Sequence, residues 1–234
     1  MNAETPKAAE LNLPQAFLLL ATNDKDGKPV VPMYVLRTTL AGAILAELDL
    51  IGAIGLQGKL VRATGTAPET DFQRELELIR GKSRPHTPKR WVSMLEGRAE
   101  MQRVYEGMAA LGIVEHVGEK HLGLFRTVRY PEKDHAPEAA LLTKIQAALG
   151  GGAPAAPATP DAGTPAPAKA DAKAPDARTT ALIALLQAAG LLGKLIPAAD
   201  KIRASALAKD YWPSRAVEVE LRMIRLAEEE EPGI

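Results

Sequence analysis

The chain has 234 residues, of which 46% are hydrophobic but only 4% are aromatic, and its 29 basic residues balance its 29 acidic residues. A core of aliphatic side chains and alanine favours helices over a β-sandwich, and the balanced charge argues against nucleic acid as a partner. The sequence contains no cysteine, which excludes disulfides, thiolate catalysis and zinc sites with sulfur ligands.

Hydrophobic periodicity and capping residues predict a helical core over residues 11–149. The predicted helices cover residues 11–21, 40–50, 70–79, 88 onward, 100–111 and 136–149. Thr87 precedes Pro88, a cap followed by proline at the first helical position, while Thr70 and Gln73 have the spacing of a capping box. The other segments are predicted as a turn at 23–27, an irregular loop or edge strand at 30–36, a strand or extended segment at 54–63, and a β-hairpin at 113–128 that turns at Gly118, Glu119 and Lys120.

The composition changes at residues 150–175, which consist mainly of Ala, Pro and Gly. Such a segment buries too little apolar surface to offset its conformational entropy, so it is predicted to be a disordered linker, as the first ten residues are predicted to be a flexible N-terminus. Beyond it, helices are predicted at 177–189 with Asp176 as N-cap, at 198–208, and from a cap at Ser214 to about 230. Each is apolar on one face, so residues 176–230 are expected to pack on residues 11–149 as one domain.

The most apolar segment is LAGAILAELDLIGAIGL, residues 40–56, which contains Glu47 and Asp49. It is shorter than the stretch of about 18 uninterrupted apolar residues that a membrane span requires, so we expect it to be buried in protein. Glu47 then needs a hydrogen-bonding or basic partner, or a gap to solvent. The first residues, MNAETPKAAELNLPQ, lack the basic and then apolar regions of a signal peptide, so we expect a cytoplasmic protein.

An ordered series of segments resembles the Golgi phosphoprotein 3 family, which includes bacterial members. The segments are LLLATNDKDG, LAGAILAELDLIGAIGL, APETD, RWVSMLEG, GIVEHVGEKHLGLFRTVRYP and ARTTALIALLQAAGLLGKLIP, spread over residues 11–224. The resemblance implies a single, mainly α-helical domain with a protruding β-hairpin that contributes to self-association. It also implies a non-enzymatic peripheral protein on the cytosolic face of a membrane, which binds phosphatidylinositol 4-phosphate and, in eukaryotes, the tails of membrane proteins. Residues 150–175 would be an Ala/Pro-rich insertion in a bacterial-type member.

In that family the lipid pocket uses a tryptophan in the loop before the LAG helix, an arginine at the start of that helix, and two arginines three residues apart on the helix before the hairpin. The matching positions here are Pro32, Ala41, Arg98 and Met101, of which Arg98 keeps the residue type. Tyr34, Arg37 and Arg103 lie close to these positions in the sequence and are expected to complete a headgroup site with Arg98. Arginine donates paired hydrogen bonds to phosphate, and tyrosine donates one from an interfacial ring. The alternative is that these arginines form surface salt bridges.

The segment RGKSRPHTPKR, residues 80–90, carries five basic residues and no acid. They are Arg80, Lys82, Arg84, Lys89 and Arg90. Near an anionic membrane each Lys or Arg contributes about 1 kcal/mol, so this basic loop is expected to face anionic phospholipid. The alternative is a solvated loop.

Catalytic and cofactor motifs are absent from the sequence. It contains neither a G-x-x-x-x-G-K-[ST] loop nor a G-x-S-x-G elbow, so we expect no enzyme and no cofactor. His116 and His121 would face each other across the hairpin, but no carboxylate lies at a helical spacing from them, so we expect no metal there. Two hypotheses follow: a peripheral membrane protein that binds anionic lipid headgroups and serves as an adaptor, or a soluble protein-interaction module that has lost lipid recognition.

Overall fold

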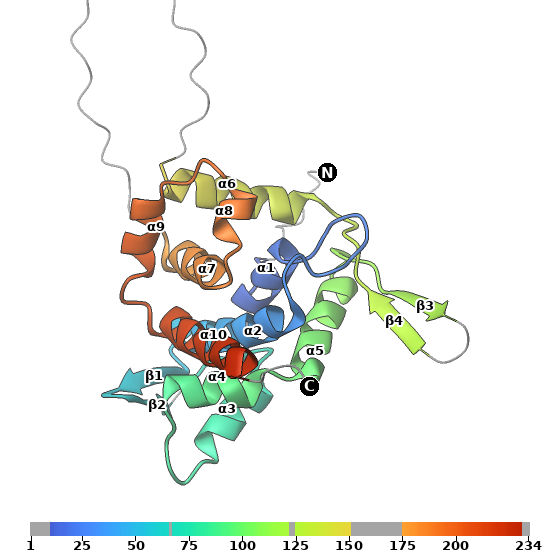
Figure 1. The fold of residues 1–234 in the computed structure, drawn as a ribbon. Helices are drawn as coiled ribbons and strands as arrows, with labels where there is room; N and C mark the ends of the chain where they lie inside the picture. Colours follow the sequence, from blue (N-terminus) through green and yellow to red (C-terminus); the bar gives the residue numbers. More distant parts are fainter. Residues whose placement is uncertain (1–9, 66, 122–124, 151–174, 231–234) are drawn as a thin grey trace, which may run out of the picture.

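Helices account for most of the computed structural model, which describes residues 10–65, 67–121, 125–150 and 175–230 (Figure 1). The helices are α1 (Leu13–Leu20), α2 (Met33–Leu50), α3 (Gln73–Arg80), α4 (Pro88–Leu95), α5 (Arg98–Ala110), α6 (Ala136–Ala148), α7 (Ala177–Ala188), α8 (Leu192–Leu195), α9 (Lys201–Ala208) and α10 (Trp212–Glu230). The strands are β1 (Ile54–Gln57), β2 (Leu60–Ala63), β3 (Val117–His121) and β4 (Phe125–Arg129). The predicted class, a single mainly helical domain, is confirmed. The predicted flexible N-terminus and Ala/Pro-rich linker lie almost entirely outside the described residues.

Helix α2 occupies the centre of the domain and packs on α1, α4, α7 and α10. Every residue from Leu40 to Leu48 is buried, as predicted from the apolar segment. Glu47, also buried, accepts a hydrogen bond from the backbone N–H of Leu13 at 2.7 Å. Its other oxygen accepts one from Arg178 Nη2 at 2.9 Å, so the predicted need for a basic partner is confirmed.

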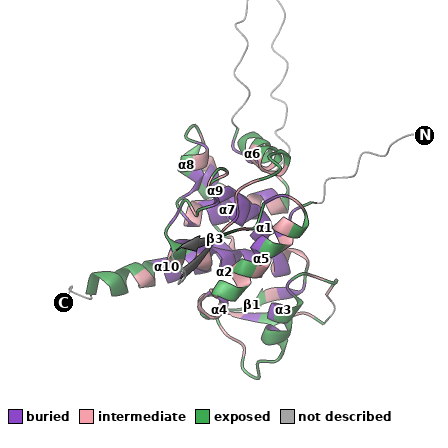
Figure 2. Ribbon diagram, turned by 90° about the vertical axis from the view of Figure 1, so that its right-hand side faces the viewer, coloured by how far each residue is buried: buried purple, intermediate pink, exposed green. Residues whose placement is uncertain are grey.

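The C-terminal helices belong to the same core as the N-terminal ones. Helix α7 packs on α1 and α2, and α10 packs on α2, α4 and α7. The close crossing of α2 and α10 needs Gly42, because a Cβ atom there would overlap Val217 Cγ2. Figure 2 shows the buried residues gathered in these central helices, while the C-terminal end of α10 projects from the body and is exposed.

Helix α2 begins at Met33, so the prediction of an irregular loop or edge strand at residues 30–36 is wrong for its second half. Pro32 occupies the N-cap position with a ψ of 146°, and Val35 and Leu36 are buried against the core. Burial of these two side chains outweighs the modest helix propensity of the segment. Helix α10 likewise begins at Trp212, which places the predicted cap Ser214 inside the helix.

Residues 54–63 form a hairpin rather than one extended segment. Strand β1 pairs with β2 in antiparallel register from Ile54↔Ala63 to Gln57↔Leu60. The chain turns at Gly58, whose φ of +62° lies in the left-handed region that favours glycine. The isolated glycine was the available signal for this turn.

The second hairpin has a different register from the predicted one. Strands β3 and β4 pair from Val117↔Arg129 to His121↔Phe125, so Gly118, Glu119 and Lys120 belong to a strand and not to the turn. Cross-strand pairing over five residue pairs outweighs the turn preference of a single glycine. The hairpin protrudes from the helical body, as expected (Figure 1).

Two predicted helix caps are present and one predicted capping box is not. Thr87 Oγ1 accepts a hydrogen bond from the Arg90 amide at 3.4 Å, and Asp176 accepts one from the Thr179 amide at 2.9 Å. Helix α3 instead begins at Gln73, after the predicted cap Thr70. Within the described residues, no helix combines the length and the apolar character that crossing a bilayer would take.

Candidate anion-binding surface

The start of α2 and the start of α5 lie against each other. Thr38 Oγ1 donates a hydrogen bond to Glu96 Oε2 at 2.8 Å, which fastens α2 to the link between α4 and α5. Arg37 adjoins Thr38, and Arg98 follows Glu96 as the first residue of α5. The hydrogen bond therefore places the part of α2 that carries Arg37 beside the link that leads to Arg98, two residues that the sequence predicts to share a headgroup site. With Tyr34 they form what we call the α2–α5 cluster.

The members of the α2–α5 cluster differ in exposure. Arg98 is exposed and makes no ion pair with any described residue. Arg37 is half-buried, and its Nε atom is shielded from solvent without a hydrogen-bond partner among the described residues. Tyr34 packs partly against the core. The cluster therefore offers one free guanidinium at the surface and a second one that is partly desolvated.

Arg103 has a partner inside the protein. Its Nη2 atom contacts Glu75 on α3, whose side chain is 2% exposed, and lies 3.9 Å from Glu100 Oε1. Because a buried carboxylate without a counter-ion is costly, the charge of Arg103 is used to offset that of Glu75. Arg103 thus contributes less charge to an external anion than Arg98 does.

The four positions that match the family's lipid pocket differ here in how exposed they are. Pro32 is exposed at the N-cap of α2, and Met101 packs partly against the core. Ala41 is 0% exposed, in the middle of the packed α2 helix. Of the four positions, the one occupied by Arg98 presents a basic group to solvent.

A second basic site lies between the first hairpin and the basic loop. A hollow of about 310 Å³ is lined by Arg62 of β2, Arg80 at the end of α3, and Lys82, together with Val61, Ala63, Thr64, Ile79 and Pro85. The three basic residues are exposed, and the lining contains no acid. A hydrogen bond of 2.9 Å from the Val61 amide to the His86 carbonyl holds the loop against β2. We call Arg62, Arg80 and Lys82 the basic hollow.

Arg62 was missed by sequence reasoning, although a weak signal existed. Strand β2 alternates a buried Val61 with an exposed Arg62, the pattern of a half-buried strand. What the sequence did not contain was the approach of the 80–90 loop to that strand. The site is therefore assembled from segments that look unrelated along the chain.

The rest of the basic loop continues along α4. Arg84 and Arg90 are exposed, whereas Lys89 Nζ lies 3.5 Å from Glu220 Oε2 on α10. Helix α4 has eight residues and is therefore about 12 Å long. Along the chain, α4 follows the basic loop and is followed by Arg98 at the start of α5.

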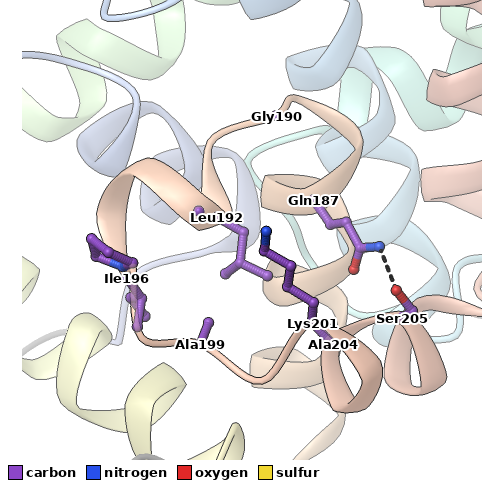
Figure 3. Close-up of a pocket in the computed structure, with 10 residues that line it drawn as sticks. Gln187, Gly190, Leu192, Ile196, Ala199, Lys201, Ala204 and Ser205 are labelled. Atoms are coloured by element: carbon purple, nitrogen blue, oxygen red, sulfur yellow. Dashed lines mark hydrogen bonds between the residues drawn. The ribbon is translucent and has the colours of Figure 1, made fainter.

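The other large hollows of the described residues lack this concentration of positive charge. One of about 380 Å³ lies among α7, α8 and α9 and is lined mainly by small and apolar residues such as Leu192, Ile196 and Ala199 (Figure 3). Lys201 is its one charged lining residue, and Gln187 donates a hydrogen bond to Ser205 across one side at 3.1 Å. Nothing in this lining resembles a nucleophile with an adjacent base.

Comparison with known proteins agrees with the arrangement of helices and hairpins. The family described as Golgi phosphoprotein 3 (GPP34) matches residues 13–224, which is most of the chain. Individually curated proteins give no match. The chain belongs to the Golgi phosphoprotein 3 (GPP34) family.

Proposed function

We propose that this protein is a non-enzymatic peripheral membrane protein that binds the phosphate groups of anionic lipid headgroups on the cytosolic face of a membrane. The observation that carries the proposal is the basic hollow, where three exposed cations line one concavity without an acid. Because the chain as a whole has no net charge, attraction to an anion has to come from a local concentration of this kind. Membership in the Golgi phosphoprotein 3 family supports the same reading.

The chemistry of the basic hollow suits a phosphomonoester. Arg62 and Arg80 each offer a planar guanidinium that donates paired hydrogen bonds, and Lys82 adds a point charge. Each residue contributes about 1 kcal/mol near an anionic surface, and Arg84 and Arg90 add to the sum. Because exposed charges are screened within about 10 Å at 0.1 M salt, binding should weaken steeply as salt is added.

The α2–α5 cluster would form a second contact with lipid. Arg98 would bind a phosphate oxygen, while Arg37 and Tyr34 would support it from the start of α2. Phosphatidylinositol 4-phosphate, the ligand implied by the family resemblance, is our candidate headgroup. We keep Arg103 in a supporting role, because it already neutralises Glu75.

Vesicle co-sedimentation at low salt tests this proposal. Wild-type protein should pellet with phosphatidylcholine vesicles that contain phosphatidylserine or phosphatidylinositol 4-phosphate, and not with phosphatidylcholine alone. A variant with Arg80→Glu and Lys82→Glu should lose at least about tenfold in affinity, since reversing two charges removes more than 1.4 kcal/mol. The matched control is Lys194→Glu with Lys209→Glu, which changes the net charge equally at exposed positions of the C-terminal helices.

The comparison of the two variants decides the outcome. Equal pelleting of both variants would show that net charge, not the basic hollow, controls binding. If the wild type pelleted equally poorly with neutral and with anionic vesicles, the lipid proposal would be contradicted.

The second candidate function is a protein-interaction module that keeps the scaffold without lipid recognition. It is favoured by the replacement of three pocket positions, at Pro32, Ala41 and Met101. Under either function the protruding hairpin is a candidate surface for self-association, and tails of membrane proteins are candidate partners. Sedimentation velocity of the wild type and of a variant shortened at the hairpin tests self-association directly, because the sedimentation coefficient should fall to that of a monomer.

A further inference from the structure

The turn after α1 is fastened to the segment that follows the second hairpin. Gly27 has a φ of +64°, and a Cβ atom there would overlap the backbone of Tyr130 and Pro131, so the two chains touch at this point. The Glu132 amide donates a hydrogen bond to the Asp24 carbonyl at 2.9 Å. Backbone contacts therefore hold Asp24 beside Glu132, independently of any side-chain interaction.

His135 joins these two acids at the N-cap of α6. The segment that carries it is held by hydrogen bonds from the Lys133 and Asp134 amides to the Ile113 carbonyl, at 2.8 and 3.1 Å. His135 Nδ1 contacts Glu132 Oε2. One ligand atom from each of Asp24, Glu132 and His135 lies within 4.8 Å of the others.

One oxygen of the Glu132 carboxylate lacks a hydrogen bond. Its side chain is 3% exposed, and its Oε1 atom is buried without a hydrogen-bond partner among the described residues. Among the described residues its ion-pair partner is His135, at Oε2, and no lysine or arginine pairs with it. A buried, unpaired carboxylate oxygen beside a second acid is costly unless a cation neutralises it.

We propose that Asp24, Glu132 and His135 form a binding site for a divalent metal ion of the zinc class. Zinc accepts carboxylate oxygen and imidazole nitrogen at about 2.0–2.2 Å, which sets ligand atoms about 3.3 Å apart. The ligand atoms of the three residues already lie within 4.8 Å of one another, close to that spacing. Calcium and magnesium favour six or more oxygen ligands, so a site with an imidazole selects against them. A water molecule would complete the coordination.

This site differs from the histidine pair considered in the sequence. His116 lies against the ring of Tyr130, with 5.2 Å between centroids, and does not belong to the cluster. The metal would tie the turn after α1 to the base of the β3–β4 hairpin and to the start of α6. Its role would therefore be to hold the hairpin base in place, and the inference does not depend on lipid binding.

Calorimetric titration of metal-free protein with zinc tests the proposal. We expect one zinc per chain, with no comparable binding of magnesium or calcium. Loss of an outer-sphere partner typically weakens metal sites 10–100-fold, so removing a direct ligand by Glu132→Gln or Asp24→Asn should cost more than about 100-fold. The matched controls are Asp26→Asn in the same turn and His116→Ala on the adjacent segment, both expected to keep wild-type affinity.

A second measurement separates a metal ligand from a residue that only supports the fold. Glu132→Gln keeps the size of the side chain and removes one of two neighbouring negative charges, so the metal-free variant should unfold at or above the wild-type temperature. Zinc should raise the unfolding temperature of the wild type and of Asp26→Asn but not that of Glu132→Gln.

Two results would overturn the proposal. One is a wild-type protein that binds no zinc at one per chain. The other is a zinc affinity of Glu132→Gln and Asp24→Asn equal to that of Asp26→Asn. If the variants do not fold, X-ray absorption of the wild-type zinc complex decides, because the proposal requires one imidazole in a shell of oxygen and nitrogen, and a spectrum without imidazole contradicts it.

Discussion

Replacing Arg178 by methionine is expected to destabilise the protein by about 3 kcal/mol, because it leaves Glu47 buried without its counter-ion. Glu47 is 5% exposed and lies in the last turn of the central helix α2. Arg178 reaches it from α7 and bonds both of its carboxylate oxygens. Methionine keeps most of the aliphatic stem of the side chain, so the loss of charge dominates the effect.

The magnitude follows from the surroundings of the pair. Removing one partner of a buried ion pair typically costs about 3–5 kcal/mol. The lower end applies here, because the Leu13 amide still donates to Glu47 at 2.7 Å and the Arg178 side chain is 30% exposed, which lets water approach. For a chain of this size each kcal/mol lowers the unfolding temperature by about 2–4 °C, so we expect a loss of about 6–12 °C.

Urea unfolding followed by circular dichroism at neutral pH measures this loss. The double variant Glu47→Gln with Arg178→Met should recover about 2 kcal/mol relative to Arg178→Met alone, because the amide still accepts the Leu13 hydrogen bond and carries no charge. The control Arg215→Met, at an exposed position, should stay within about 0.5 kcal/mol of the wild type. A loss below about 1 kcal/mol for Arg178→Met, or a double variant no more stable than the single one, would refute the reasoning.

Two further predictions concern packing and pH. Gly42→Ala should lower the free energy of unfolding by about 1–2 kcal/mol, because the overlap with Val217 outweighs the gain in helix propensity. The control is Gly107→Ala, whose Cβ would make an ordinary contact. It should be neutral or stabilising in the same urea titration. Burial, and then the charges of Asp24 and Glu132, raise the pKa of Glu138 to about 7. A carboxyl whose folded pKa lies above its unfolded value of 4.5 stabilises the fold below that value and loses this contribution as pH rises through 7. Glu138→Gln, measured in a chelator, should therefore unfold at about the wild-type temperature at pH 5 and at a clearly higher one at pH 8. A difference that does not vary with pH would contradict this account.

Capping signals in the sequence correctly predicted where two of the helices begin. Thr87 with Pro88 and Asp176 with Thr179 are interactions within three residues, so the caps of α4 and α7 could be predicted from neighbours alone. The start of α2 could not, because no cap residue marks it and burial of Val35 and Leu36 against other helices decides it. The register of the second hairpin was missed for the same reason, since pairing with β4 places Gly118 in a strand.

The candidate sites, too, were predictable from the sequence only in part. The basic loop and Arg98 were visible as sequence, but Arg62 joins the basic hollow only because β2 packs beside that loop. Arg103 was expected to bind a headgroup, and the fold gives it the buried Glu75 as a partner. A charge read along the chain shows its sign but not which other charge will lie next to it.

By itself, the sequence determined the helical class, the family, the lack of a recognised catalytic motif and the need of Glu47 for a partner. The tertiary structure decided that this partner is Arg178, which is 131 residues away. It also decided that Asp24 lies beside Glu132 and His135. The physical reason is range: propensity, capping and periodicity act over a few residues, whereas burial and ion pairing depend on which distant segments the packed core brings into contact.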